Sequence, residues 1–242
     1  MALYLWLREK VLPSLPATYH DTVNEVADRV INTYPYSKID GFAEVPGYQF
    51  AMLYRAVPPQ YLNDAYIHAL CDRLCHDIPS ARFAGFQSAT TRGKRKMKHQ
   101  VMSSDILKLV GNQAAELEVK TIFVPINFSN AHWCSIVVDT HSKTIHCYDP
   151  VNQKEFTSVV EVLAMSLKTK VLPAFRIEVD NDPLQFDLFS CGVYVCWMFI
   201  NRSLSRASEA TDMAVLTKRR FELFYYVLTG RLIKDEPAST VE

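Results

Sequence analysis

The feature that most constrains this chain is the stretch QFDLFSCGVYVCWMFI, at residues 185–200. Residues 193–200 are apolar throughout, so periodicity alone does not separate a buried helix from a buried strand. Ser190 is a good residue for the position before a helix, and Gly192 permits a tight approach by another segment. We therefore expect a buried helix that begins at Cys191 and carries this thiol at its N-terminus.

A cysteine in that position is a candidate nucleophile. Because an ordinary thiol has a pKa of about 8.5, it is mostly protonated at neutral pH and needs activation. The helix N-terminus supplies positive dipole, a neighbouring imidazole can accept the proton, and a carboxylate can fix the tautomer of that imidazole. The chain offers both groups upstream, as His132 in AHW (131–133) and Asp149 in YDP (148–150).

A predicted hairpin can bring these two side chains together. The segments TIFVPI, WCSIVVD and TIHCYD predict three short strands, and the polar, turn-prone residues 139–143 separate the second from the third. In an antiparallel pair, residues equidistant from the turn lie opposite each other. The midpoint between His132 and Asp149 falls inside this turn, so we expect them to meet at the open end of the hairpin.

An acyl-transfer site also needs hydrogen-bond donors for the oxyanion. The backbone N–H of Cys191 is one candidate, and the side-chain amide of Gln185, six residues earlier, is another. Each of these residues alone is more often an ordinary core or strand position. The order and separation of these residues along the chain are what favour a catalytic set over ordinary core positions.

The remaining pattern predicts an α+β protein, since helical segments come first and mixed strands and helices follow. We expect a helical N-terminal extension (1–45), a catalytic domain (46–234) and a flexible tail (235–242). The extension either pads one side of the domain or shapes a substrate-docking surface. The predicted helices outside the nucleophile segment start near Gln60, Ser103 or Ser104, residue 153 and Thr211, and one more strand covers 175–179.

Composition narrows the class of partner. Lys+Arg and Asp+Glu both number 26, so no net field attracts the chain to nucleic acid or to a membrane surface. The apolar runs are too short to span a membrane, and the N-terminus lacks the pattern of a signal peptide. Six cysteines in 242 residues predict reduced thiols, hence an intracellular location in nucleus or cytoplasm. We also expect a monomer.

Two other groups of residues could bind a ligand. His68, Cys71 and Cys75 fall on one side of a predicted helix, but a zinc site needs four ligands and no second pair is evident. We therefore expect no metal and no organic cofactor. The basic run at 90–99 is interpreted either as a solvated loop or as a binding patch, such as a nuclear-localisation signal.

The motifs resemble those of the Ulp/SENP-type cysteine proteases, which process SUMO and related ubiquitin-like modifiers and share a fold with the adenoviral protease. The resemblance covers about residues 55–228 and rests on VPINFSNAHWCSIVVD (124–139), IHCYDP (145–150) and QFDLFSCGVYVC (185–196), with a weaker match in YLNDAYIHAL (61–70). It implies a papain-like, adenoviral-protease-type fold with a central mixed β-sheet flanked by helices.

Carried over to this sequence, the resemblance implies a role for each matching residue. His132 would be the base, Asp149 its orienting carboxylate, Cys191 the nucleophile and Gln185 an oxyanion donor. The substrate-binding residues implied in the same way are Trp133, Tyr61 and Asp64, the first two as aromatic walls of a channel that admits a Gly-Gly tail.

Three departures from the family pattern bear on which modifier is recognised. Tyr61 stands where the family usually has Trp, Ser190 where it has Asp, and Leu188-Phe189 where it has Gly-Ser.

The expected function is that of a thiol protease or isopeptidase. It would cleave after the C-terminal Gly-Gly of a SUMO-like or other ubiquitin-like modifier through a thioester on Cys191. The alternatives are a polypeptide-processing protease, an acetyltransferase on the same fold, or a non-catalytic modifier-binding module. Maturation and deconjugation of the modifier stay equally open.

Overall fold

A computed structural model describes residues 1–91, 100–129, 131–205 and 215–233. Residues 92–99, Thr211 and residues 235–242 lie outside these ranges. The structure therefore does not describe the basic run, the predicted start of the last helix or the tail.

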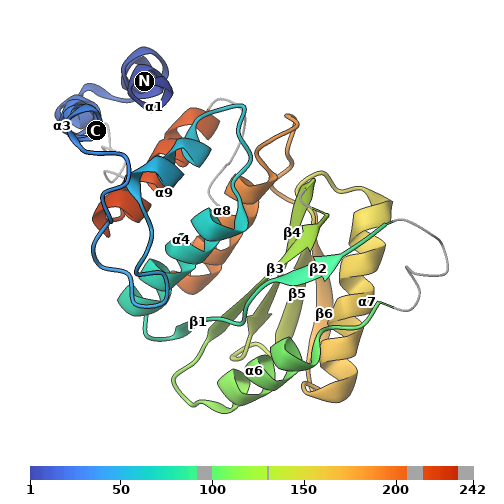
Figure 1. The fold of residues 1–242 in the computed structure, drawn as a ribbon. Helices are drawn as coiled ribbons and strands as arrows, with labels where there is room; N and C mark the ends of the chain where they lie inside the picture. Colours follow the sequence, from blue (N-terminus) through green and yellow to red (C-terminus); the bar gives the residue numbers. More distant parts are fainter. Residues whose placement is uncertain (92–99, 130, 206–214, 234–242) are drawn as a thin grey trace, which may run out of the picture.

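The centre of the fold is a mixed sheet of six strands (Figure 1). Its order is β1-β3-β4-β5-β6, and β2 also pairs with β3. The β3–β4 and β4–β5 pairs are antiparallel, whereas β1, β2 and β6 each pair in parallel. The predicted hairpin and mixed sheet are therefore confirmed. The strands are β1 (Ala81–Phe83), β2 (Gln87–Ala89), β3 (Thr121–Phe128), β4 (His132–Asp139), β5 (Thr144–Tyr148) and β6 (Arg176–Asp180).

Helices cover both faces of this sheet and also form the N-terminal segment. That segment holds α1 (Ala2–Trp6), η1 (Leu7–Val11), α2 (Leu12–Ser14), η2 (Ala17–Tyr19) and α3 (His20–Asn32), and the short helix η3 (Phe50–Ala56) follows it. The others are α4 (Asp64–Asp77), α6 (Ser104–Ala115), α7 (Lys154–Lys170), α8 (Cys191–Ser203) and α9 (Leu216–Thr229). As predicted, α8 begins at Cys191, and Ser103 caps α6 by accepting from the backbone N–H of Ile106.

Two apolar clusters fill the space on the two sides of the sheet. One contains Phe123 and Val137 from the strands together with α4, α8 and α9, and the other contains Ile122 and Val138 together with α6 and α7. Alternate residues of each strand thus face different layers, as the pleat requires. The N-terminal segment joins the α8 cluster through Leu7, Val11, Val23 and Ala27, which are fully buried.

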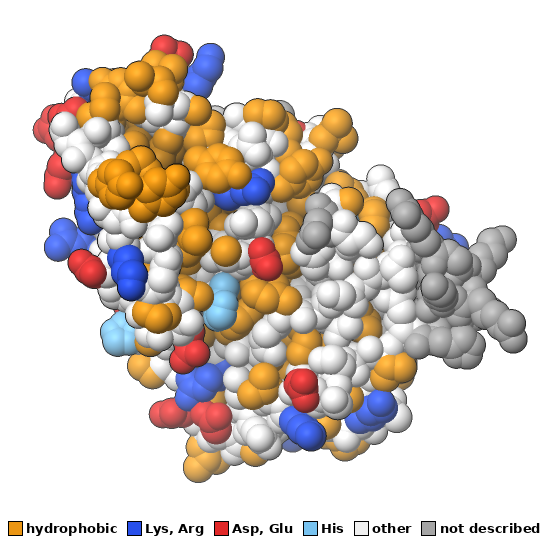
Figure 2. Space-filling model, in the orientation of Figure 1, with side chains coloured by type: hydrophobic (Ala, Val, Ile, Leu, Met, Phe, Trp, Pro, Cys, Tyr) orange, Lys and Arg blue, Asp and Glu red, His pale blue; other side chains and the backbone are white. Residues whose placement is uncertain are grey.

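The surface carries both signs of charge. On the face shown in Figure 2, acidic and basic side chains are interspersed, and hydrophobic side chains gather over the N-terminal helices. Within the described ranges, none of the helices combines the length and the apolar character that membrane crossing requires.

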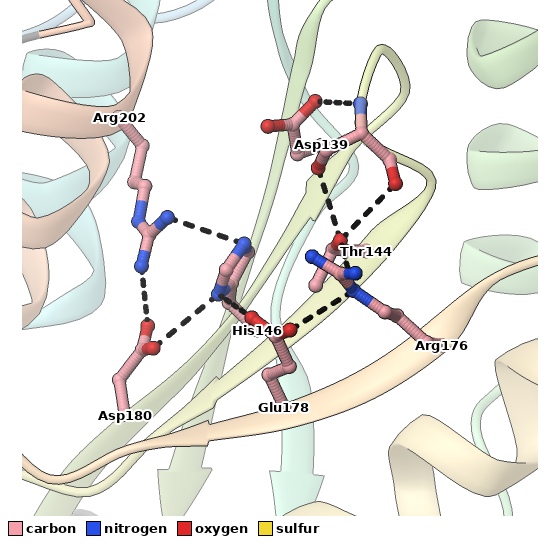
Figure 3. A network of polar contacts seen from close by, with 8 residues as sticks. Asp139, Thr144, His146, Arg176, Glu178, Asp180 and Arg202 are labelled. Carbon is pink, nitrogen blue, oxygen red and sulfur yellow. Dashed lines mark hydrogen bonds and ion pairs between the residues drawn. The ribbon is translucent and has the colours of Figure 1, made fainter.

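A polar network anchors the C-terminal end of α8 to the edge of the sheet (Figure 3). Arg202 donates to the Asp180 carboxylate on β6 at 2.9 Å and lies 3.2 Å from Nε2 of His146 on β5. The other ring nitrogen of His146 lies 3.3 Å from Asp180. Since His146 is buried, these contacts satisfy polar atoms that water reaches poorly. The opposite end of the helix, which carries Cys191, is thereby held relative to β5.

We expect Arg202→Ala to lower the free energy of unfolding by about 1–3 kcal/mol, because Nε2 of the buried His146 and the Asp180 carboxylate each lose their hydrogen bond to this side chain. The matched control is Arg176→Ala, which removes an arginine whose side chain is 65% exposed from the same network. It should cost at most about 0.5–1 kcal/mol. Urea denaturation measures both values, and equal losses in the two variants would contradict this account.

Candidate active site

His132 and Asp149 form a short polar contact at the centre of the site. Nε2 of His132 lies 2.7 Å from Oδ1 of Asp149, and both side chains are buried. The carboxylate also accepts from the backbone N–H groups of Val151, at 3.2 Å, and Gln153, at 2.8 Å. On the other side, the imidazole packs 4.4 Å from the ring of Phe156 on α7. The pair is therefore fixed from the sheet and from α7 together.

The expected meeting of these residues is confirmed, but their predicted register is wrong by two residues. In the structure Asp139 pairs with Thr144 and Ser135 with Tyr148, so continuing the ladder places Cys134 opposite Asp149. His132 lies two residues further along β4, on the same face as Cys134, because side chains alternate with a period of two. It reaches Asp149 diagonally.

Cys134 is a site residue that the sequence reasoning missed. Its Sγ lies 3.6 Å from Oδ1 of Asp149, and burial raises the pKa of this thiol well above its ordinary value, with a further contribution from Asp149. His132, Cys134 and Asp149 are zinc-ligand types whose ligand atoms lie within 4.8 Å of one another. The protonated thiol and the existing His132–Asp149 bond both disfavour an ion there. That no metal is used stays a prediction.

Cys191 is the first residue of α8, and its side chain interacts with His132 closely enough to raise the pKa of the imidazole. Because Nε2 of the imidazole faces Asp149, Nδ1 is the ring nitrogen available to the sulfur. Burial lowers the pKa of His132, but the interactions with Asp149 and Cys191 raise it by more, to about 9. The structure thus brings together the three predicted residues in an arrangement that favours a charged imidazole beside the thiol.

Gln185 lies next to the segment that carries Asp149, but its side-chain amide points toward Asp187. The backbone N–H of Gln185 donates to the carbonyl of Pro150 at 2.7 Å, which joins the loop to the segment that carries Asp149. Its side-chain Nε2 donates to the backbone oxygen of Asp187 at 2.8 Å and to its carboxylate at 2.9 Å. The role of Gln185 as an oxyanion donor stays a prediction.

The predicted substrate-binding residues line one pocket of about 390 Å³. Trp133 is buried and donates from its indole N–H to the carbonyl of Leu62 at 2.8 Å. Tyr61 is 39% exposed. The full lining consists of Arg55, Tyr61, Leu62, Asn63, Asp64, Asn127, Ala131 and Trp133.

Gly192 connects this pocket to the helix of Cys191. A Cβ atom at Gly192 would lie 2.8 Å from the Cβ of Leu62, closer than real carbon contacts, and 3.5 Å from the Trp133 ring. The expected tight approach at this glycine is therefore present. It lets α8 pack directly against the residue whose carbonyl holds Trp133.

We expect Gly192→Ala to lower the free energy of unfolding by about 1–3 kcal/mol, because the added methyl group must displace Leu62. Gly47→Ala is the control, since a Cβ there meets no atom within 4 Å. Thermal or urea denaturation gives both values. If Gly192→Ala were as stable as the control, the close approach would not be required.

The raised pKa of His132 makes its contribution to stability depend on pH. Because the folded value of about 9 exceeds the ordinary value of 6.5, the stabilisation is fully present below pH 6.5 and is lost as the pH rises through 9. We therefore expect the difference in unfolding free energy between the wild type and His132→Gln to shrink across this window. Denaturation at several pH values tests this, and a difference that is constant or grows would contradict it.

Comparisons with known proteins agree with this geometry. Residues 76–225, more than half of the chain, match the model of the Ulp1 protease family, C-terminal catalytic domain. No curated protein sequence matches the chain.

Solved structures share the fold. The Ulp1 protease domain in complex with Smt3, the yeast ortholog of SUMO, aligns with a TM-score of 0.62 and 16% identity over 91% of this chain and 98% of that one. SUMO protease Ulp1 with its catalytic cysteine oxidised to a sulfinic acid gives 0.60 and 17%, over 90% and 97%. The Ulp1-like SUMO protease catalytic domain of Chaetomium thermophilum gives 0.58 and 18%, over 89% and 90%. Together with the family match, they establish the predicted fold, and the chain belongs to the Ulp1 protease family of cysteine peptidases.

Proposed function

We propose that this protein hydrolyses peptide or isopeptide bonds after the C-terminal Gly-Gly of a ubiquitin-like modifier, through a thioester on Cys191. The observation that carries the proposal is the buried His132–Asp149 pair, whose imidazole also interacts with the thiol at the N-terminus of α8. A pocket walled by Trp133 and Tyr61 lies beside this helix.

In the first half of the reaction, His132 takes the proton of the Cys191 thiol, Sγ attacks the glycine carbonyl carbon, and a tetrahedral oxyanion forms. The backbone N–H of Cys191 at the helix N-terminus is positioned to stabilise this charge, with the amide of Gln185 as the proposed second donor. As the C–N bond breaks, His132 gives its proton to the departing amine, and the acyl group is left as a thioester.

In the second half, His132 accepts a proton from water, and the resulting hydroxide oxygen attacks the thioester carbonyl. The S–C bond breaks, the glycine carboxylic acid leaves, and the proton on His132 returns the site to its starting state. Asp149 stays hydrogen-bonded to the imidazole throughout and stabilises its charged form. The buried position of Asp149 explains why this support would be strong.

Steric access favours a tail of glycines. Cys191 is 1% exposed, and Trp133, which forms the wall beside it, is almost fully buried and held by the Leu62 carbonyl. An extended chain without side chains is the segment of polypeptide best able to reach such a thiol. The Ulp1 domain solved with Smt3 supports a ubiquitin-like protein as the partner. We further propose a monomer located in the nucleus or cytoplasm, where its six thiols stay reduced.

The test uses a panel of modifiers (SUMO, other ubiquitin-like proteins and ubiquitin), each ending in a thiol-reactive group in place of the C-terminal carboxylate. We expect a covalent adduct with at least one modifier, and the adduct should be absent in Cys191→Ala. A second matched variant, Cys75→Ala, removes a more exposed cysteine and should react like the wild type.

Intact mass and peptide mapping identify the modified residue, and circular dichroism shows whether each variant is folded. No adduct from any modifier with a folded wild type would contradict the proposed substrate class. The alternatives would then be processing of other polypeptides, acyl transfer or binding without cleavage. An adduct that persists in Cys191→Ala would contradict the nucleophile.

A further inference from the structure

Residues 185–190, which lead into α8, alternate between inward and outward positions. Gln185 and Ser190 are buried and Asp187 is partly buried, whereas Phe186 and Leu188 are 75% and 86% exposed. The loop therefore turns its polar side chains inward, toward the start of the helix that carries Cys191.

Asp187 is the centre of the hydrogen bonds in this loop. Its Oδ1 accepts from the backbone N–H groups of Phe189, at 3.1 Å, and Ser190, at 2.9 Å, and from Nε2 of Gln185 at 2.9 Å. Its Oδ2 accepts from the hydroxyl of Ser190 at 2.5 Å. Such a turn fixes the backbone immediately before Cys191.

The same contacts determine which way the amide of Gln185 faces. The backbone oxygen and the carboxylate of Asp187 are both acceptors, so the NH₂ group of Gln185 must point toward them and its oxygen away. In the opposite orientation, the Gln185 oxygen would face two acceptors at about 3 Å. Asp187 thus controls where the donors of this amide lie.

The buried guanidinium of Arg220 lies near the start of α8 and offsets the negative charge of Asp187. Arg220 on α9 donates to the hydroxyl of Ser190 at 3.2 Å and to the carbonyls of Phe189, Gln60 and Ala56. Burial lowers the pKa of Arg220 to about 10, and the negative charge of Asp187 opposes that shift. Arg220 is therefore charged at neutral pH, and Ser190 links it to Asp187.

We propose that Asp187 is a positioning residue for the reaction: its carboxylate fixes the backbone that presents the thiol and the N–H of Cys191. This role rests on the proposed function only through the identity of the nucleophile and of the oxyanion donor. Ser190 stands where the family usually has Asp, so in this chain the carboxylate at the helix start comes from residue 187 and reaches Arg220 through the serine hydroxyl.

The experiment measures kcat and KM on the modifier that reacts, and acylation of Cys191 by p-nitrophenyl acetate, whose tetrahedral intermediate needs the oxyanion donors but no modifier. We expect Asp187→Ala to lower kcat and the acylation rate by about tenfold to a hundredfold, with KM changed by less than about twofold, because the pocket at Trp133 is unaltered. Asp187→Asn retains one acceptor oxygen and should recover part of the loss.

Two further variants separate positioning from stability. Asp182→Asn removes an exposed negative charge from the same loop and should leave both rates unchanged. In a Gln185→Ala background, Asp187→Ala should lower the rates by the same factor within about threefold, because the backbone N–H groups of Phe189 and Ser190 depend on the carboxylate whether or not Gln185 is present.

The following results would overturn the proposal. One is an unchanged kcat and acylation rate in folded Asp187→Ala or Asp187→Asn, and another is a loss that disappears when Gln185 is absent. If the wild type cleaves no modifier but is acylated by the ester, the substrate proposal fails and the variants still decide the role of Asp187. If the ester does not acylate Cys191 in the wild type, both the nucleophile and this role are wrong.

Discussion

The buried hydrogen bond between His132 and Asp149 is the interaction on which the rest of the site depends. A carboxylate with so little access to water is stable only with several donors, and Asp149 has the imidazole and two backbone N–H groups. One of those N–H groups belongs to Gln153, the residue before α7. The same side chain therefore orients the imidazole and joins strand β5 to the next helix.

The nucleophile is positioned by packing from the other layer of the fold. Helix α8 approaches Leu62 through Gly192, and the Leu62 carbonyl holds the indole of Trp133. At its far end, Arg202 ties α8 to β6 and β5. The thiol, the aromatic wall and the sheet therefore form one packed unit, which explains how residues from four separate segments keep a fixed geometry.

The sequence predicted the elements of the site better than the contacts between them. The helix start at Cys191 and the meeting of His132 with Asp149 could be inferred, because both follow from local patterns and from the symmetry of a hairpin. The register could not, since a change of two residues keeps every side chain on its face and leaves the hydrophobic pattern unaltered. For the same reason Cys134, which actually lies opposite Asp149, was missed.

The long-range contacts of the site could not be predicted from the sequence. Arg220 is separated from Ser190 by 30 residues, and nothing in its local pattern on α9 distinguishes it from a surface arginine. The hydrogen bonds of Asp187 are local, and an Asp three residues before the serine that precedes a helix is a signal that could have been used. The direction of the Gln185 amide follows from that carboxylate and not from the spacing between Gln185 and Cys191.

The measurement that tests the central claim most directly is the order in which the six cysteines react with iodoacetamide at neutral pH, followed by peptide mass mapping. Exposure alone favours Cys75, which is less buried than Cys191, although burial raises the pKa of Cys75 to about 12. If His132 and the helix N-terminus activate the thiol, Cys191 is alkylated first in the wild type, and this preference is lost in His132→Ala. Faster labelling of Cys75, or a rate at Cys191 that does not depend on His132, would contradict the account.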